Sequence, residues 1–168
     1  ISPMGVDLQI NGGLGLSFTE LTMEELPNLF RLLDLLWIHG VEAICPTFVS
    51  CELKALRLGL EVLREARKAN TASRCKLLGA HLEGPFLSKS RHGAHEFESL
   101  CAPSLFALNE MINGFENEIA LVTLAPELPG SFEVIRHLKM LGIVVSLGHS
   151  SADELVSEEA FKNGVSML

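Results

Sequence analysis

The chain has 168 residues, of which 48% are hydrophobic and 20% are charged. This composition excludes a disordered chain, and the length fits one domain with a sizeable core. The formal net charge of -8 argues against a general binder of nucleic acid or of anionic membranes. No apolar run in the sequence reaches the roughly 18 residues that a membrane span needs.

The N-terminal segment lacks the basic and apolar pattern of an export signal, and Ile1 is not an initiator Met. We therefore expect a processed chain or a piece of a longer protein. The cysteines are scattered and form no CxxC pair, which is typical of reduced thiols rather than of a disulfide framework or a zinc knuckle. We expect a cytoplasmic protein with four structural cysteines: Cys45, Cys51, Cys75 and Cys101.

Short apolar runs alternate with segments of helical period along the whole chain. The apolar runs predict five strands and the beginning of a sixth, at residues 5–10, 41–48, 76–82, 119–124, 143–147 and 165–168. The helical segments follow the first five strands. Their expected starts are marked by Thr22 with Glu25, by Pro103, by Ser131 and by Ser151 with Glu154, and the second helix covers about residues 52–70.

Successive strand–helix units with apolar strands predict an α/β fold with a parallel sheet. A doubly wound sheet and a (β/α)8 barrel both fit this order. The glycines after the first strand lack the rest of a phosphate-binding motif. Polar residues gather where the strands finish, as in a TIM barrel. We therefore predict one barrel domain over residues 1–168, incomplete at about five βα units plus a sixth strand.

His81 and Glu83 end the third predicted strand, and their side chains point to the same side because they are two residues apart. Burial of a carboxylate beside an imidazole is unfavourable unless a partner compensates, and a divalent metal is one such partner. The alternative, in which His81 and Glu83 bond to each other or to loop amides, stays open here.

His149 follows a glycine at the end of the fifth predicted strand, where an imidazole could ligate zinc or iron. Taken alone, a histidine satisfied at the entry to a helix is the simpler interpretation. A barrel brings the third and fifth strand ends onto one rim, so Glu83 and His149 together point to a shared metal. They supply two ligands, whereas a catalytic zinc usually has three plus water.

Gln9 and Asn11 share one face at the end of the first strand. Neutral amides are poor ligands for zinc, so this end of the strand favours a single-metal site rather than a two-metal site. Two interpretations stay open for the pair: a role around metal-bound water, and an amide ladder that ends the strand.

A locally basic loop follows the third strand at residues 88–95. It carries Lys89, Arg91, His92 and His95 in an otherwise acidic protein. Such a loop could hold a hydroxylated or anionic ligand, and a solvated run of charges is the alternative.

Six short motifs occur in order along the chain, at residues 9–13 (QINGG), 45–47 (CPT), 81–86 (HLEGPF), 91–95 (RHGAH), 122–127 (VTLAPE) and 146–150 (SLGHS). Together they resemble the N-acetylglucosamine-6-phosphate deacetylase family of the amidohydrolase superfamily. The resemblance implies a TIM barrel of the metal-dependent hydrolase type. It also implies removal of acetate from N-acetylglucosamine 6-phosphate, which leaves glucosamine 6-phosphate.

The resemblance also implies roles for individual residues. Glu83 and His149 become ligands of one divalent ion, with zinc first and iron, cobalt or manganese as other candidates. Ala94 and His95 would lie against the sugar, and Gln9, Asn11 and His81 around the metal-bound water.

Other parts of the implied site fall outside the given sequence. The third ligand and the general-base Asp are expected beyond Leu168, so no catalytic general base is assigned within residues 1–168. Much of the phosphate site and a flanking β-rich domain are expected outside these residues as well. The full-length protein is expected to be a homodimer.

The partner expected for the site is therefore a small amino-sugar phosphate, with no nucleic acid and no membrane. We expect little or no turnover by residues 1–168 alone, because the ligand set and the barrel are incomplete. One alternative is an amidohydrolase that acts on a cyclic amide, although such an enzyme would favour a carbamylated lysine and a histidine pair. The other is a non-catalytic truncated product that associates with a full-length subunit.

Overall fold

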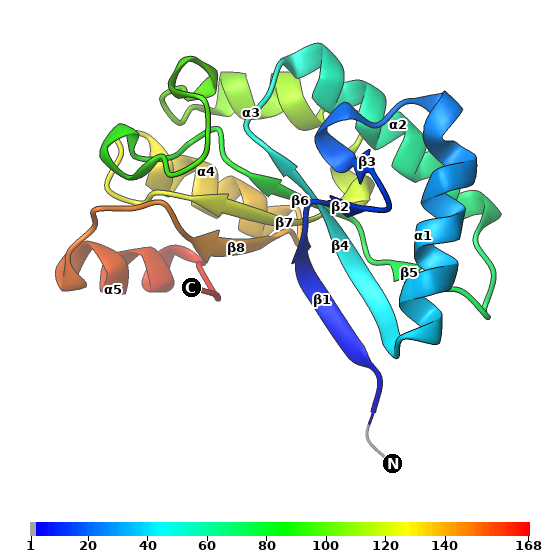
Figure 1. Ribbon diagram of the computed structural model, residues 1–168. Helices are drawn as coiled ribbons and strands as arrows, with labels where there is room; N and C mark the ends of the chain where they lie inside the picture. Colours follow the sequence, from blue (N-terminus) through cyan, green and yellow to red (C-terminus); the bar gives the residue numbers. More distant parts are fainter. Residues whose placement is uncertain (1–2) are drawn as a thin grey trace.

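The computed structural model describes residues 3–168, which form a curled parallel sheet with helices around it (Figure 1). The main strands are hydrogen-bonded in the order β1-β4-β6-β7-β8, and a short strand, β5, also pairs with β4. Their bounds are Gly5–Ile10 for β1, Val41–Val49 for β4, Lys76–Leu77 for β5, Ala80–Glu83 for β6, Ile119–Leu124 for β7 and Val144–Leu147 for β8.

The strand order follows the order of the chain, and all neighbouring pairs in this sheet are parallel. A doubly wound sheet reverses its strand order at a switch point, and this sheet does not. The α/β class and the parallel sheet are therefore confirmed. Residues 3–168 form a half-barrel, and the closed (β/α)8 barrel remains a prediction.

Within these residues, five α-helices follow the strands and lie around the outer side of the sheet (Figure 1). Consecutive helices pack against one another from α1 to α5. No helix within residues 3–168 has both the length and the apolar character to cross a membrane. The bounds are Leu26–Ile38 for α1, Leu53–Ala69 for α2, Leu105–Ile112 for α3, Ser131–Met140 for α4 and Glu154–Asn163 for α5. A small antiparallel hairpin of β2 (Gly12–Gly13) and β3 (Leu16–Ser17) follows β1.

The third predicted strand differs from the structure. Residues 76–82 form two short strands, β5 and β6, because Gly79 adopts a φ of +140° between them. Strand β6 also extends one residue further than expected, to Glu83.

The sixth predicted strand, from Val165 to Leu168, is wrong as an extended strand. It is present only as a parallel bridge between Ser146 and Met167. Val165 is buried and Met167 is half-buried, whereas Leu168 is 83% exposed and forms no bridge. Only the middle of the apolar run therefore pairs with β8.

Several expected helix starts are wrong, and the hydroxyl groups of Ser131 and Ser151 have other partners. Thr22 makes no capping hydrogen bond, and a 3-10 turn separates it from α1. Ser131 is the first residue of α4, where its hydroxyl donates to the carbonyl oxygen of Ala125. The cap of α5 is Asp153 rather than Ser151.

Alternation along the strands separates the core from the site. Phe48 and Leu82 are buried in the hydrophobic core. Because successive side chains of a strand point to opposite faces, Thr47, His81 and Glu83 point to the inner face of the curled sheet. The inner face therefore carries the polar residues at the carboxyl ends of the strands, which is where TIM barrels build their sites.

Candidate functional site

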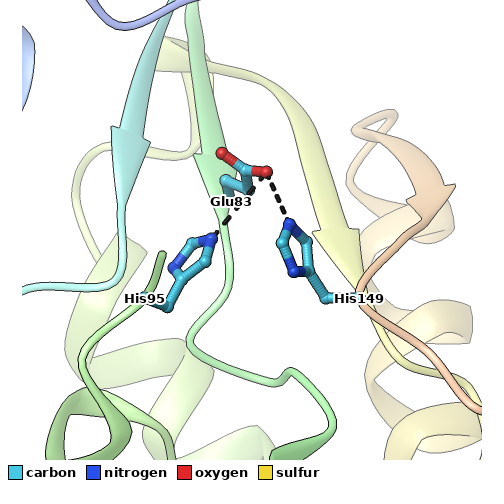
Figure 2. A group of neighbouring side chains, drawn as sticks. All are labelled: Glu83, His95 and His149. Atoms are coloured by element: carbon cyan, nitrogen blue, oxygen red, sulfur yellow. Dashed lines mark hydrogen bonds and ion pairs between the residues drawn. The ribbon is translucent and has the colours of Figure 1, made fainter. Parts of the chain in front are cut away.

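Glu83, His95 and His149 meet at the carboxyl ends of the strands (Figure 2). Glu83 ends β6, His149 follows β8, and His95 lies in the loop after β6. One ligand atom from each residue lies within 4.8 Å of the other two. Oε1 of Glu83 is 3.0 Å from Nε2 of His149 and 3.8 Å from Nε2 of His95. The structure thus brings Glu83 and His149 together, and adds His95 to them.

The ring of His149 is oriented by the basic loop that packs beside it. Its Nδ1 lies 2.9 Å from the carbonyl oxygen of Arg91. A carbonyl only accepts, so in the neutral ring the proton is on Nδ1 and the lone pair is on Nε2, toward Glu83. A carboxylate oxygen and an imidazole lone pair repel each other unless a proton or a cation lies between them. The donor set therefore fits a divalent ion, and a carbonyl behind a ligating histidine is typical of metal sites.

His149 has an unusual backbone and a close neighbour. Its φ is +50°, which is uncommon for a residue other than glycine and is found more often at functional sites. A Cβ added to Gly93 would lie 3.1 Å from Cε1 of His149. The glycine in the basic loop therefore makes room for the imidazole of His149.

Glu83 is held as an anion. Burial acts to raise the pKa of Glu83, but the surrounding polar groups, the hydrogen bond from Gln9 first among them, outweigh it, so the pKa is below its ordinary value. Nε2 of Gln9 donates to Oε2 of Glu83 at 3.0 Å. The same amide lies 3.4 Å from Oδ1 of Asn11. Gln9 therefore contacts the carboxylate directly, and Asn11 is linked to it through Gln9.

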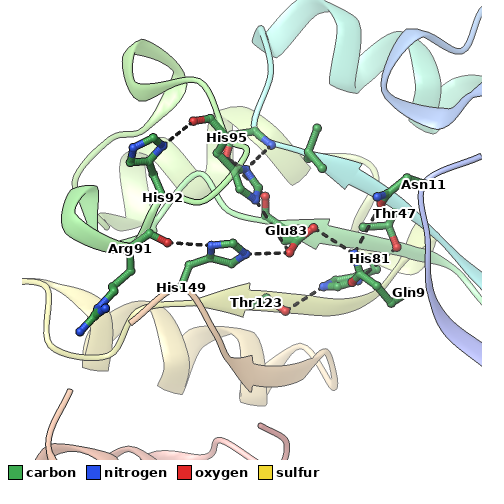
Figure 3. Close-up of polar contacts among 12 residues, drawn as sticks. Gln9, Asn11, Thr47, His81, Glu83, Arg91, His92, His95, Thr123 and His149 are labelled. Carbon is green, nitrogen blue, oxygen red and sulfur yellow. Dashed lines mark hydrogen bonds and ion pairs between the residues drawn. The ribbon is translucent and has the colours of Figure 1, made fainter. Parts of the chain in front are cut away.

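His81 lies between two threonine hydroxyls on the inner face (Figure 3). Nε2 is 2.8 Å from Oγ1 of Thr123, and Nδ1 is 3.3 Å from Oγ1 of Thr47. Burial lowers the pKa of His81, and the charge of Glu83 offsets only part of this shift. His81 is therefore neutral near pH 7. It lines one hollow together with Gln9, Glu83 and His149.

Met167 and Leu168 border the same hollow, beside Ser146 of β8. They contribute apolar side chains and no ligand. Among the described residues, the cluster that could hold a metal contains Glu83, His95 and His149. The third ligand and the Asp general base that the resemblance places beyond Leu168 therefore stay predictions.

His95 is buried, whereas Ala94 is exposed. Nδ1 of His95 is 3.3 Å from the backbone nitrogen of Ser50 and 3.0 Å from its Oγ. Burial lowers the pKa of His95, although the charge of Glu83 acts in the opposite direction. The family resemblance implied contact of Ala94 and His95 with a sugar, and this contact stays a prediction. The closeness of His95 to Glu83 was not predicted, because loop contacts leave no periodic signal.

The contacts of two further residues at the site were not predicted from the sequence. Arg91 acts through its carbonyl oxygen, which no side-chain pattern could reveal, while its guanidinium donates to Oγ of Ser151. Glu127 accepts from Oγ of Ser150 and from the backbone nitrogen of Ser151, both at 2.6 Å. These contacts fix the chain directly after His149, and in the sequence Glu127 was only one of the polar residues that follow a strand.

No protein-family model matches the chain. Over its whole length it is 37% identical to N-acetylglucosamine-6-phosphate deacetylase of Bos taurus and spans 41% of that protein. It is 30% identical to N-acetylgalactosamine-6-phosphate deacetylase of Escherichia coli O157:H7, of which it spans 44%. The chain thus covers about two fifths of the length of its curated relatives.

The similarity extends to solved structures. The crystal structure of N-acetylglucosamine-6-phosphate deacetylase from Pasteurella multocida matches 98% of this chain with a TM-score of 0.83 and 30% identity, over 41% of its own length. The enzyme from Mycobacterium smegmatis matches 98% with a TM-score of 0.84 and 28% identity, also over 41% of its length. The chain is therefore related over almost its whole length, in sequence and in fold, to the N-acetylglucosamine-6-phosphate deacetylases.

Proposed function

We propose that residues 1–168 form the part of an N-acetylglucosamine-6-phosphate deacetylase that holds its catalytic metal. The reaction is hydrolysis of the acetamide of N-acetylglucosamine 6-phosphate to glucosamine 6-phosphate and acetate. One observation carries the proposal beyond the similarity: Nε2 of His149 and Oε1 of Glu83 face each other at 3.0 Å, while Nδ1 of the same ring lies 2.9 Å from the carbonyl oxygen of Arg91. This arrangement favours one shared cation.

Glu83 and His149 would hold the ion, and Gln9 would keep the carboxylate in place through its hydrogen bond. An oxygen and an imidazole nitrogen suit zinc, with iron, cobalt or manganese as other candidates. The chemistry that such an ion supplies when bound is polarisation of the amide carbonyl and activation of water. Asn11 and His81 would line the water side of the site.

His95 and Ala94 would face the sugar, with His95 as a hydrogen-bond donor that aligns the acetamide group. The third ligand and an Asp general base would come from the part of the deacetylases that follows the position of Leu168. The proposal also includes a closed barrel, a homodimer and a cytoplasmic location for the whole protein. The chain-ordered parallel strands support the barrel, and four free thiols support the location.

A chimera tests this function. Residues 1–168 would replace the matching segment of the Bos taurus relative, and acetate release would be measured with zinc and N-acetylglucosamine 6-phosphate. We expect turnover by the chimera, none by its Glu83→Gln variant, and little or none by residues 1–168 alone. A folded, zinc-loaded chimera without turnover would contradict the proposal.

The same assay separates the rival substrates. N-acetylgalactosamine 6-phosphate tests the specificity of the Escherichia coli relative, and a cyclic amide tests the other amidohydrolase hypothesis. The residues favour the linear amide, because the strand ends within residues 3–168 carry neither the lysine nor the histidine pair that a cyclic-amide hydrolase would be expected to use, and Gln9 and Asn11 lie at the end of the first strand instead. Size-exclusion chromatography with metal analysis tests the non-catalytic hypothesis, which predicts association without stoichiometric metal.

A further inference from the structure

Ser50 lies directly after β4 and contacts two residues of the site. Its backbone nitrogen is 3.3 Å and its Oγ 3.0 Å from Nδ1 of His95. The same Oγ is 3.4 Å from the backbone carbonyl oxygen of Glu83. A side chain at Gly84 would overlap Oγ of Ser50, so the glycine after Glu83 leaves the space that this hydroxyl occupies.

These contacts determine which nitrogen of His95 carries the proton. A backbone N–H only donates, so Nδ1 of His95 must accept, and in the neutral ring the proton is then on Nε2. The hydroxyl of Ser50 has one proton, which it can donate to this nitrogen at 3.0 Å or to the carbonyl oxygen of Glu83 at 3.4 Å. The shorter contact favours donation to the nitrogen, which reinforces this tautomer. Nε2–H is the atom that faces Oε1 of Glu83 at 3.8 Å.

His149 presents the opposite case, although its Nε2 faces the same carboxylate oxygen (Figure 3). Its Nδ1 meets a carbonyl acceptor from Arg91, whereas Nδ1 of His95 meets donors from Ser50. The centroids of the His95 and His149 rings are 4.7 Å apart, and the ring planes are nearly perpendicular. Two neighbouring histidines thus offer Glu83 a lone pair from one ring and an N–H from the other.

We propose that Ser50 is a positioning residue that keeps His95 a hydrogen-bond donor and out of the ligand set of the metal. Only Glu83 and His149 then offer free lone pairs to a cation, and Nε2–H of His95 remains available for an oxygen atom of the substrate. The role of His149 as a metal ligand and of His95 as a donor to the substrate rests on the proposed function. The tautomer of His95 and its dependence on Ser50 do not rest on that function.

The tautomers can be read directly by long-range 1H–15N NMR of the metal-free chain with labelled histidine at pH 7.5. We expect His95 in the Nε2–H form and His149 in the Nδ1–H form. Ser50→Ala keeps the backbone donor and removes the hydroxyl, so the minor Nδ1–H population of His95 should rise about fivefold. Ser50→Thr should restore the original ratio of the two tautomers. Ser90→Ala is the control: Ser90 lies in the same loop as His95, but its hydroxyl bonds to that of Ser151, so its loss should leave the ratio unchanged.

Ser50→Asp supplies the opposite partner. Its carboxylate would accept from Nδ1–H of His95 and expose a lone pair on Nε2, so His95 should acquire a proton on Nδ1. On addition of zinc, Nε2 of His95 should shift in Ser50→Asp and not in the original chain, whereas Nε2 of His149 should shift in both.

A Nδ1–H tautomer of His95 in the original chain would overturn the proposal, as would a zinc-induced shift of its Nε2 there. Unchanged tautomers in both Ser50→Ala and Ser50→Asp would show that Ser50 is not the cause. If zinc failed to bind at all, the proposed function would fall, while the metal-free spectra would still decide the role of Ser50.

Discussion

Nε2 of His149 lies 3.0 Å from Oε1 of Glu83 while Nδ1 of the same ring is held by the carbonyl oxygen of Arg91. In the neutral ring this places two electron pairs face to face, which only a proton or a cation makes favourable. Three features produce this arrangement: Glu83 at the end of β6, the positive φ of His149, and the loop that carries Arg91. Each can be changed separately by mutation.

Replacement of Glu83 by Gln should weaken zinc binding at least about 100-fold. Replacement of a residue that hydrogen-bonds to a metal ligand typically lowers metal affinity about 10–100-fold, and loss of a ligand itself should have a larger effect. Isothermal titration of the metal-free chain measures the affinity. Glu158→Gln is the matched control, because Glu158 is an exposed carboxylate on α5. Equal zinc affinities in the two variants would exclude Glu83 as a ligand.

Zinc should also stabilise the fold, through its contacts with Glu83 and His149. At a free zinc concentration 100 times the dissociation constant, the free energy of unfolding should rise by about 2.7 kcal/mol. Urea denaturation with zinc and with a chelator measures this difference. The His149→Asn variant should show almost none of it, and an undiminished gain in that variant would place the ion elsewhere.

Gly93→Ala should reduce both stability and zinc affinity. An alanine at its φ of +61° costs about 1–2 kcal/mol, and the new Cβ would press on the ring of His149. Gly142→Ala is a close control, because Gly142 has a φ of +76° and open space around its Cβ position. Both variants should lose stability, and only Gly93→Ala should bind zinc more weakly. Equal zinc affinities would show that contact with the ring does not matter.

Acidification should destabilise the metal-free chain, partly through His81. Its pKa is below the ordinary value of 6.5 in the folded protein, so below pH 6.5 the unfolded chain takes up a proton that the folded chain resists. Stability from this residue is complete above that pH and is lost as the pH falls toward the folded pKa, by at most about 1.4 kcal/mol per pH unit.

Urea denaturation between pH 7.5 and 5.5 tests this dependence, and His81→Gln should have a shallower slope. His95 contributes in the same direction, because its pKa is also lowered. The slope of the variant should therefore be reduced and not abolished. Identical slopes in the variant and the original chain would show that His81 is not the proton acceptor.

The strands and the meeting of Glu83 with His149 could be predicted from sequence, because both follow from periodicity and from the rule that parallel strand ends share an edge. The bounds of β1 and β7 agree with the expected residues. Loop contacts could not be predicted in this way. The approach of His95 to Glu83 depends on the path of residues 88–95, and the tautomer of His149 depends on a backbone carbonyl.

The prediction of some helix starts was wrong for a related reason, because the partner of a capping side chain also depends on tertiary contacts. Ser131 has the right residue type for a cap, but its hydroxyl donates to the carbonyl oxygen of Ala125, and such competition between partners depends on the tertiary fold. Gly93 leaves room for the ring of His149, which the presence of a glycine in the loop could not by itself indicate. The residue types of Ser131 and Gly93 thus mark positions with particular backbone or hydrogen-bond requirements, but their contacts depend on neighbours in the tertiary fold.

The most direct test of the metal site is X-ray absorption spectroscopy of the chain loaded with one equivalent of zinc, compared with the Glu83→Gln and His149→Asn variants. We predict one zinc ion with an oxygen and a single imidazole in its coordination shell. The imidazole signal should disappear in His149→Asn. A zinc shell that is unchanged in both variants, or one made of cysteine sulfur, would contradict it.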